Sequence, residues 1–298
     1  MSEQQQADLD AMLRQAPVDF RGEVTALRSG FEELMQRIPI PDDARRVATA
    51  VGGVNAIEAT IEGIDSANVI LYFHGGVYVI GSANASMPLV ADLARRTRTK
   101  VVSVDYRLAP EHPHPAAVED AKAVYEGLLS QGVEPGNIAF SGESAGGGLA
   151  VAALLAIRDA GTPLPSAAFV MSPWVDLTVS GGSVMDKQEV DPLLTGEGLR
   201  WGAGNYVGGA DPSAPYISPI FADLKGLPPL LIQVGSHEIL LSDAVRLADR
   251  AAGSDVAVTL DVVPGVPHVF QAYAAVLDEG DAALNRATNF LKTHFTVT

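Results

Sequence analysis

From about residue 67 onward, short apolar runs alternate with longer helical patterns, and this alternation constrains the fold more than any other feature. Helical patterns lie at about 85–97, 115–130, 145–160, 241–252 and 278–295. The runs between and around them have the length and residue types of buried strands, at 69–73, 101–104, 138–140, 167–171, 230–234 and 256–263. Such alternation predicts an α/β fold, in which helices cover both faces of a mostly parallel sheet.

The composition supports one large core and excludes several classes of function. Of the 298 residues, 47% are hydrophobic and 19% charged, and a chain of this length buries roughly 70 to 75% of its surface on folding. The formal net charge of −16 disfavours phosphate backbones and anionic lipid, so neither nucleic acid nor membrane is an expected partner. The absence of cysteine excludes disulfides, thiolate metal sites and a cysteine nucleophile.

The two ends of the alternating region have their own character. Residues 1–40 favour helix, and the prolines and aspartates at 39–43 end it. The β-type runs 47–51 and 54–61, separated by Gly52-Gly53, predict a hairpin at the sheet edge. Residues 178–218 interrupt the alternation with paired glycines and prolines and are expected to form an insertion over one edge of the sheet. An apolar stripe at helical spacing lies in the first segment, formed by Phe20, Val24, Leu27, Phe31, Leu34 and Ile38.

No segment predicts export or membrane insertion. The first eight residues contain neither a basic nor an apolar stretch, unlike a secretory signal. The longest nearly apolar run, 145–157, is too short to span a bilayer. We therefore expect a cytoplasmic protein without stable membrane insertion.

The segment Gly142-Glu143-Ser144-Ala145-Gly146 fits the pattern G-x-S-x-G. A run typical of a buried strand precedes it, and a helical run of small residues follows it. A strand, a sharp turn and a helix form the nucleophile elbow, which holds a serine hydroxyl at the C-terminal edge of a sheet. We predict that Ser144 is a nucleophile. The alternative is a glycine-rich turn that only saves space.

A serine nucleophile requires a neutral imidazole to accept its proton and a carboxylate to orient that imidazole. Of six histidines, His268 is favoured, because it follows the expected strand 256–263 and can reach the same sheet edge as Ser144. His112 and His114 have a faintly metal-like spacing. Without a third ligand nearby, they favour a turn, and no metal is expected.

The carboxylate is expected after another strand, between the serine and the histidine in the chain. The run 230–234 leads into such a loop, and Glu238 is the first carboxylate beyond it. Asp243 is the alternative, but it falls in the following helix, where an acid in the first turn is favoured by the helix dipole. Glu238 is therefore preferred.

The segment His74-Gly75-Gly76-Val77-Tyr78 follows the expected strand 69–73. It is similar to the loop that supplies backbone N–H donors to the oxyanion in lipases and esterases, and glycine lets a backbone approach a substrate closely. We assign the oxyanion hole to the N–H groups of Gly76, Val77 and Ala145. A strand-terminating turn is the alternative.

Together these motifs resemble those of the bacterial relatives of hormone-sensitive lipase, within the α/β-hydrolases. The resemblance implies an α/β-hydrolase fold with a helical cap, made from residues 1–40 and the insertion at about 178–218, on a catalytic domain at 41–298. It also implies that residues 105–113 brace the active-site loops, and it includes relatives that form homodimers through a sheet edge. The segments that carry it span about residues 67–295 and are His74-Gly75-Gly76 with Gly81-Ser82, 105–113, 142–147, 172–176 and His268-Val269-Phe270.

Two positions depart from the family's pattern. The family's acid is usually an aspartate in an Asp-Pro-Leu context, whereas Glu238-Ile239-Leu240 stands here, and the longer glutamate requires the strand end to lie slightly further back. The third glycine of the family's H-G-G-G is Val77, whose β-branched side chain disfavours a positive φ.

The sequence thus predicts a serine carboxylesterase for small-molecule short-chain acyl esters, with the triad Ser144, His268 and Glu238 and no cofactor. A lactone or amide hydrolase with the same triad is the alternative enzyme. A ligand-binding receptor of the same fold is disfavoured, because such receptors lose the histidine that His268 supplies. Candidates for lining the pocket or cap are Phe20, Phe31, Trp174, Asp176, Trp201 and Tyr206.

Overall fold

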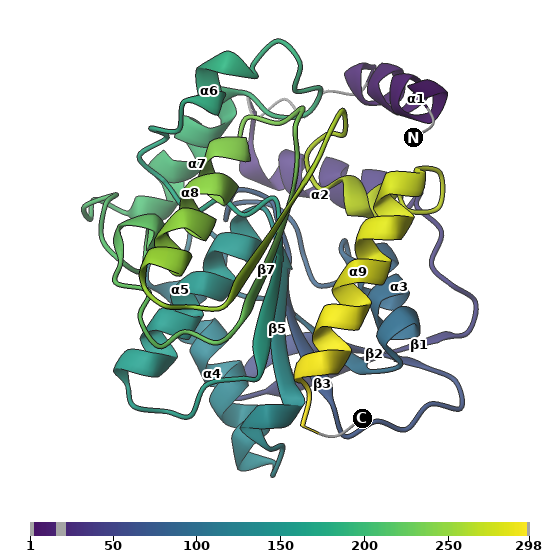
Figure 1. Cartoon of the computed structure of the whole chain (residues 1–298), viewed down its shortest axis with the longest axis vertical. Helices are drawn as coiled ribbons and strands as arrows, with labels where there is room; N and C mark the ends of the chain where they lie inside the picture. Colours follow the sequence, from purple (N-terminus) through teal and green to yellow (C-terminus); the bar gives the residue numbers. More distant parts are fainter. Residues whose placement is uncertain (1–2, 16–21, 297–298) are drawn as a thin grey trace.

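Eight strands form one sheet in the computed structural model, which describes residues 3–15 and 22–296 (Figure 1). The strand order is β1-β2-β4-β3-β5-β6-β7-β8. From β4 to β8 all neighbours are parallel, whereas β2 pairs antiparallel with both β1 and β4 and is the one reversed strand of this sheet. This confirms the mainly parallel α/β sheet. The strands are β1 (Ala44–Val51), β2 (Val54–Ile61), β3 (Val69–Phe73), β4 (Lys100–Val104), β5 (Ile138–Glu143), β6 (Ala167–Met171), β7 (Leu230–Gly235) and β8 (Val258–Val263).

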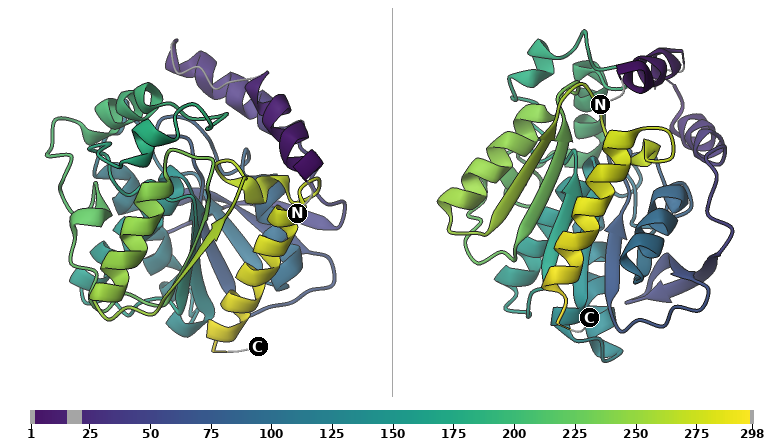
Figure 2. Two further views of the ribbon diagram at one scale, coloured as in Figure 1. Left: turned by 45° about the horizontal axis from the view of Figure 1, so that its top comes forward. Right: turned by 45° about the vertical axis from the view of Figure 1, so that its right-hand side comes forward.

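Helices cover both faces of the sheet (Figures 1 and 2). Successive residues of a strand point to opposite faces, so Ile70 and Tyr72 of β3 pack into one cluster and Leu71 and Phe73 into the other. None of the helices within the described ranges is long and apolar enough to cross a membrane. One face carries α3 (Met87–Thr97) and α9 (Asp278–His294), and the other carries α4 (Ala116–Ser130), α5 (Ala145–Asp159) and α8 (Leu241–Gly253).

Two helices precede the sheet, α1 (Glu3–Arg14) and α2 (Val24–Met35), in the upper part of the view in Figure 1. Leu9 and Leu13 of α1 pack against Val266 and Phe270. Arg28 of α2 donates to the carbonyls of Val79 and Ala109 and pairs with Glu111. Of the predicted apolar stripe, Val24, Leu27 and Phe31 contact the larger core cluster, whereas Phe20 lies outside the described residues.

The segment between β6 and β7 contains α6 (Ser183–Asp186) and α7 (Gly196–Val207). Tyr206 of α7 is buried and stacks on Tyr78, with ring centroids 3.8 Å apart. Trp174 is also buried, 6.1 Å from the Tyr78 ring. These aromatic contacts join the insertion to the core. Short 3-10 turns complete the chain at Pro135–Asn137, Pro219–Phe221 and Phe270–Tyr273.

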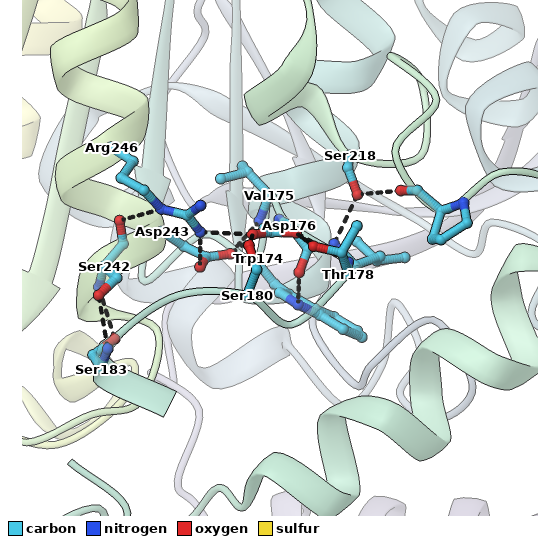
Figure 3. A network of polar contacts seen from close by, with 12 residues as sticks. Trp174, Val175, Asp176, Thr178, Ser180, Ser183, Ser218, Ser242, Asp243 and Arg246 are labelled. Atoms are coloured by element: carbon cyan, nitrogen blue, oxygen red, sulfur yellow. Dashed lines mark hydrogen bonds and ion pairs between the residues drawn. The ribbon is translucent and has the colours of Figure 1, made fainter. Parts of the chain in front are cut away.

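A polar network ties the end of β6 to α8 (Figure 3). Asp243 of α8 accepts the amides of Val175 and Asp176, both at 3.0 Å. Asp176 accepts the hydroxyl of Ser180 at 2.6 Å, and Arg246 bonds both aspartates. Asp243 and Asp176 are almost completely buried. A buried carboxylate is stable only when it is hydrogen-bonded or paired, and one arginine serves both here.

The two aspartates differ in their electrostatics. Burial and the nearby charge of Asp176 raise the pKa of Asp243 to about 7, against the opposing effects of Arg246 and the Val175 amide. Burial also acts to raise the pKa of Asp176, but Ser180, Thr178 and Arg246 outweigh it and lower that pKa. Asp176 is therefore the stronger acid of the two, and Asp243 is the one that takes up a proton first as the pH falls.

Replacement of Asp243 by asparagine is expected to flatten the pH dependence of stability. In the unfolded chain the carboxyl loses its proton near the ordinary value of 3.8, and in the folded chain near 7. Between these values the folded state binds the additional proton, so the free energy of unfolding falls as pH rises. Melting temperatures from pH 4 to pH 8 measure this slope.

The matched control is Asp249→Asn, at an exposed position of the same helix. It should keep the slope of the unchanged protein. An Asp243→Asn variant with that same slope would contradict the buried, protonated state of Asp243.

Candidate active site

Ser144 lies on a sharp turn between β5 and α5. Its backbone has φ 54° and ψ −123°, a conformation that costs a non-glycine residue on the order of 1–3 kcal/mol. Bonds to the β6 side hold the turn: the Ser144 amide donates to the Met171 carbonyl at 2.9 Å, and the Ser144 carbonyl accepts from the Trp174 amide at 2.9 Å. The surrounding chain therefore imposes the strained elbow.

The flanking glycines are required by close backbone approach. A Cβ at Gly146 would lie 2.0 Å from the Phe73 carbonyl oxygen, and one at Gly142 would lie 2.4 Å from the Gly146 carbonyl oxygen. Neither position has room for a side chain. The G-x-S-x-G pattern thus has a steric cause in the contact between α5 and the end of β3.

Glu238, in the loop after β7, is fully buried and is the carboxylate bonded to His268. His268 Nδ1 donates to Glu238 Oε2 at 2.7 Å. The other oxygen, Oε1, accepts the Gly235 amide and the Ser172 hydroxyl, both at 2.7 Å. Ser172 in turn accepts the Val269 amide at 3.1 Å. One carboxylate therefore joins the loops after β6, β7 and β8.

The charge of Glu238 acts on the imidazole. Burial lowers the pKa of His268, but the charge and hydrogen bond of Glu238 outweigh it, and the pKa lies above its ordinary value. With Nδ1–H directed at Glu238, the neutral imidazole leaves Nε2 free to accept a proton. Asp243, the alternative acid from the sequence, bonds the backbone at 175 and 176 instead.

Ser144 and His268 line one cavity of about 440 Å³. The structure thus brings together the serine and histidine that the sequence singled out, although 124 positions separate them in the chain. Most of the other side chains around the cavity are apolar. They come from α1 and α2, from the insertion, and from the loop after β8, and include Met12, Leu13, Phe31, Leu34, Met35, Ile38, Leu193, Leu194, Val269 and Tyr273.

The loop after β3 places Gly76 and Val77 on the cavity wall. Within residues 3–15 and 22–296, no acceptor pairs with the amides of Gly76, Val77 or Ala145. The Gly75 amide is occupied, because it donates to Glu143 Oε1 at 2.8 Å. Three unpaired donors therefore lie around the serine, at the positions assigned from the sequence.

Val77 adopts the positive φ that its side chain disfavours, at 50°. The valine is 2% exposed, and a Cβ at Gly202 of α7 would lie only 2.7 Å from its Cβ. The glycine on α7 thus makes room for the valine that replaces the family's third glycine. Tertiary packing overrides the local preference, as the buried and stacked Tyr78 beside it, with φ 65°, also shows.

Most aromatic candidates for the pocket lie elsewhere. Of the described residues among them, Phe31 lines the cavity, whereas Trp174, Trp201 and Tyr206 do not. Asp176 is also away from it, in the network with Arg246. Large aromatic residues in and near the insertion were therefore a poor indicator of the pocket lining, because they pack between the insertion and the core.

The sequence reasoning overlooked Glu143 on the cavity wall. Burial raises its pKa to about 7, against the lowering effects of the Gly75 amide and the charge of His268. Its place inside the G-x-S-x-G segment was the available signal. Leu193 and Leu194 were also overlooked, because an insertion without regular periodicity does not reveal which residues turn inward.

The fold and the site define a class. A parallel sheet with a serine on an elbow after β5, and a histidine bonded to a carboxylate in later loops, is the arrangement of an α/β-hydrolase. A family model of the α/β-hydrolase fold matches residues 70–272.

Comparison with similar proteins identifies the family within the α/β-hydrolases. An acetyl-hydrolase of Streptomyces hygroscopicus is 47% identical over 224 residues, which cover 75% of each chain. An esterase of Acinetobacter venetianus is 38% identical over 266 residues, covering 89% of this chain and 88% of that protein. The crystal structure of an esterase from the bacterial hormone-sensitive lipase family has a TM-score of 0.95 at 40% identity, covering 99% of each chain. The chain belongs to this family of α/β-hydrolase carboxylesterases, which confirms the resemblance.

Ser172→Ala is expected to destabilise the protein by about 1–3 kcal/mol, because it removes one of the three hydrogen bonds to the buried Glu238 carboxylate and leaves the Val269 amide without a partner among the described residues. Ser141 provides a matched control. It is also fully buried, but its hydroxyl has no partner among the described residues. Urea denaturation should show a loss for Ser172→Ala and none for Ser141→Ala, and equal losses would refute this account of Ser172.

Proposed function

We propose that the protein is a serine esterase for short-chain acyl esters, with a triad of Ser144, His268 and Glu238. The observation that carries the proposal is the pairing of His268 with the buried Glu238 in the cavity that contains Ser144. The cap belongs to the same proposal: α1, α2 and the insertion cover the cavity and supply its apolar wall. We further propose that the enzyme acts in the cytoplasm on a small-molecule ester and that neither nucleic acid nor a membrane is a partner.

Ser144 Oγ attacks the ester carbonyl carbon as His268 Nε2 accepts the hydroxyl proton. The resulting oxyanion is held by the N–H groups of Gly76, Val77 and Ala145, at about 3 kcal/mol per donor. The tetrahedral intermediate collapses when the C–O bond to the alcohol breaks and the imidazolium protonates the leaving oxygen. Glu238 stabilises the imidazolium in this step.

The acyl-enzyme is then hydrolysed. His268 accepts a proton from water, the hydroxide oxygen attacks the acyl carbon, and Ser144 Oγ leaves with the proton from His268. The cavity, at about 440 Å³, falls in the lower part of the range for small-molecule sites. This size and the apolar wall support short acyl chains. A lactone or amide hydrolase would use the same groups.

Hydrolysis of p-nitrophenyl esters from acetate to palmitate tests the proposal. Activity should be highest with short chains, and Ser144→Ala should reduce it by about 10⁶-fold, as removal of a serine nucleophile does elsewhere. Release of p-nitrophenol measures both. Activity that survives the loss of Ser144 would reject the triad. A folded protein without activity on esters or lactones would reject the esterase and favour a ligand-binding protein.

Glu238→Gln should lower kcat by about 10³- to 10⁴-fold, with KM little changed. The glutamine keeps the shape but stabilises no imidazolium, and its amide favours the wrong tautomer of His268. Asp243→Asn is the matched control, because this buried carboxylate bonds backbone away from His268. Similar losses of kcat in both variants would exclude a specific role for Glu238.

A further inference from the structure

Asp191, in the insertion between α6 and α7, is a buried carboxylate that the proposed mechanism does not use. It is 6% exposed. Its Oδ1 accepts the amides of Leu193 and Leu194, both at 2.9 Å. Its Oδ2 accepts the amide of Ile239 at 2.8 Å. Three backbone donors from two distant parts of the chain therefore converge on one side chain.

The two parts joined by Asp191 are both next to the reacting groups. Leu193 and Leu194 line the cavity, and the Ile239 amide belongs to the peptide unit that links it to Glu238. A second residue of the insertion holds Ile239 from the other side, because Ser183 Oγ donates to the Ile239 carbonyl at 2.6 Å. The insertion thus makes hydrogen bonds to both backbone groups of Ile239, the residue that follows Glu238.

Asp191 also contributes charge. The charges of Glu238, Asp191 and Glu143 all act to raise the pKa of His268, while burial lowers it. From α1, the positive charge of Arg14 faces Asp191, and the guanidinium donates to the carbonyl of Val190 at 3.1 Å. Burial raises the pKa of Asp191 itself, but the three amides and His268 favour its charged form.

We propose that Asp191 is a positioning residue, whose carboxylate locks the Glu238–Ile239 peptide to the cavity wall and keeps the His268–Glu238 pair aligned with Ser144. This rests on the proposed function. An aspartate suits the role because both oxygens only accept, and all three facing groups are N–H donors. An asparagine would present its NH₂ group to at least one of those donors.

Asp191→Asn is therefore expected to lower kcat for p-nitrophenyl butyrate by about 10- to 100-fold through misplacement of the Glu238 backbone. It should also shift the acid limb of the pH profile of kcat/KM to lower pH, because one negative charge near His268 is lost. A role in stability alone would reduce the amount of folded enzyme without moving that limb. Unchanged kcat and acid limb in the folded variant would overturn the proposal.

Two controls separate the contributions of position and charge. Ser183→Ala removes the other bond to Ile239 without a change in charge, so it should lower kcat and leave the acid limb in place. If Asp191→Asn fails to fold, Ser183→Ala still tests whether the hydrogen bonds to Ile239 matter for catalysis. Full activity of Ser183→Ala would then count against the proposal. Asp243→Asn, at a buried aspartate without a bond to Ile239, should leave kcat and the limb unchanged.

A histidine titration by NMR keeps this inference distinct from the proposed function. The His268 resonance is assigned by its absence in His268→Asn, and its pKa is compared between the unchanged protein and Asp191→Asn. A lower pKa in the variant supports the placement of Asp191 even if no ester is hydrolysed, an outcome that would reject the esterase proposal alone. An equal pKa overturns the contribution of Asp191 to the charge around His268.

Discussion

The active-site edge of the sheet depends on buried carboxylates that accept backbone N–H groups from neighbouring loops. Glu238 accepts the amide of Gly235, Glu143 that of Gly75, and Asp191 that of Ile239. A loop has no ladder of its own to satisfy its amides, and a buried carboxylate is tolerated only where donors surround it. The buried carboxylates gain hydrogen-bond donors and the loop amides gain acceptors, so the loops at this edge of the sheet are held in place by buried side chains.

This bracing also explains how the site maintains unfavourable backbone conformations. Ser144 and Val77 both have positive φ without being glycine. The first is held by bonds to β6 and its following loop, and the second by contact with Gly202 of α7 and by the stacked aromatic rings behind it. Strain of this kind persists only where the surrounding structure determines the conformation more strongly than the residue does. The insertion therefore supports the loop after β3 and also forms a wall of the cavity.

Much of the fold could be predicted, because the central strands β3, β5, β6 and β7 are buried on both faces and appear in the sequence as continuous apolar runs. β2, β3 and β6 have the predicted limits, and the other strands differ by a few residues at their ends. Ser144, His268 and Glu238 could be named because each follows a predicted strand at the same edge of a parallel sheet. The roles of Trp174 and Asp176 could not, since an aromatic or acidic residue in a loop has the same local pattern whether it turns to a cavity or to the core.

By itself, the sequence determined the order of strands and helices, the position of the elbow and the residue types available for acid–base chemistry. These follow from periodicity and from the steric demands of tight turns, which act over a few neighbouring residues. Only the tertiary structure decided that Glu238 rather than Asp243 bonds His268, that Val77 accepts a positive φ, and that Asp191 reaches the backbone of Ile239. Those outcomes depend on distances between segments far apart in the chain, and burial gives each such contact its strength.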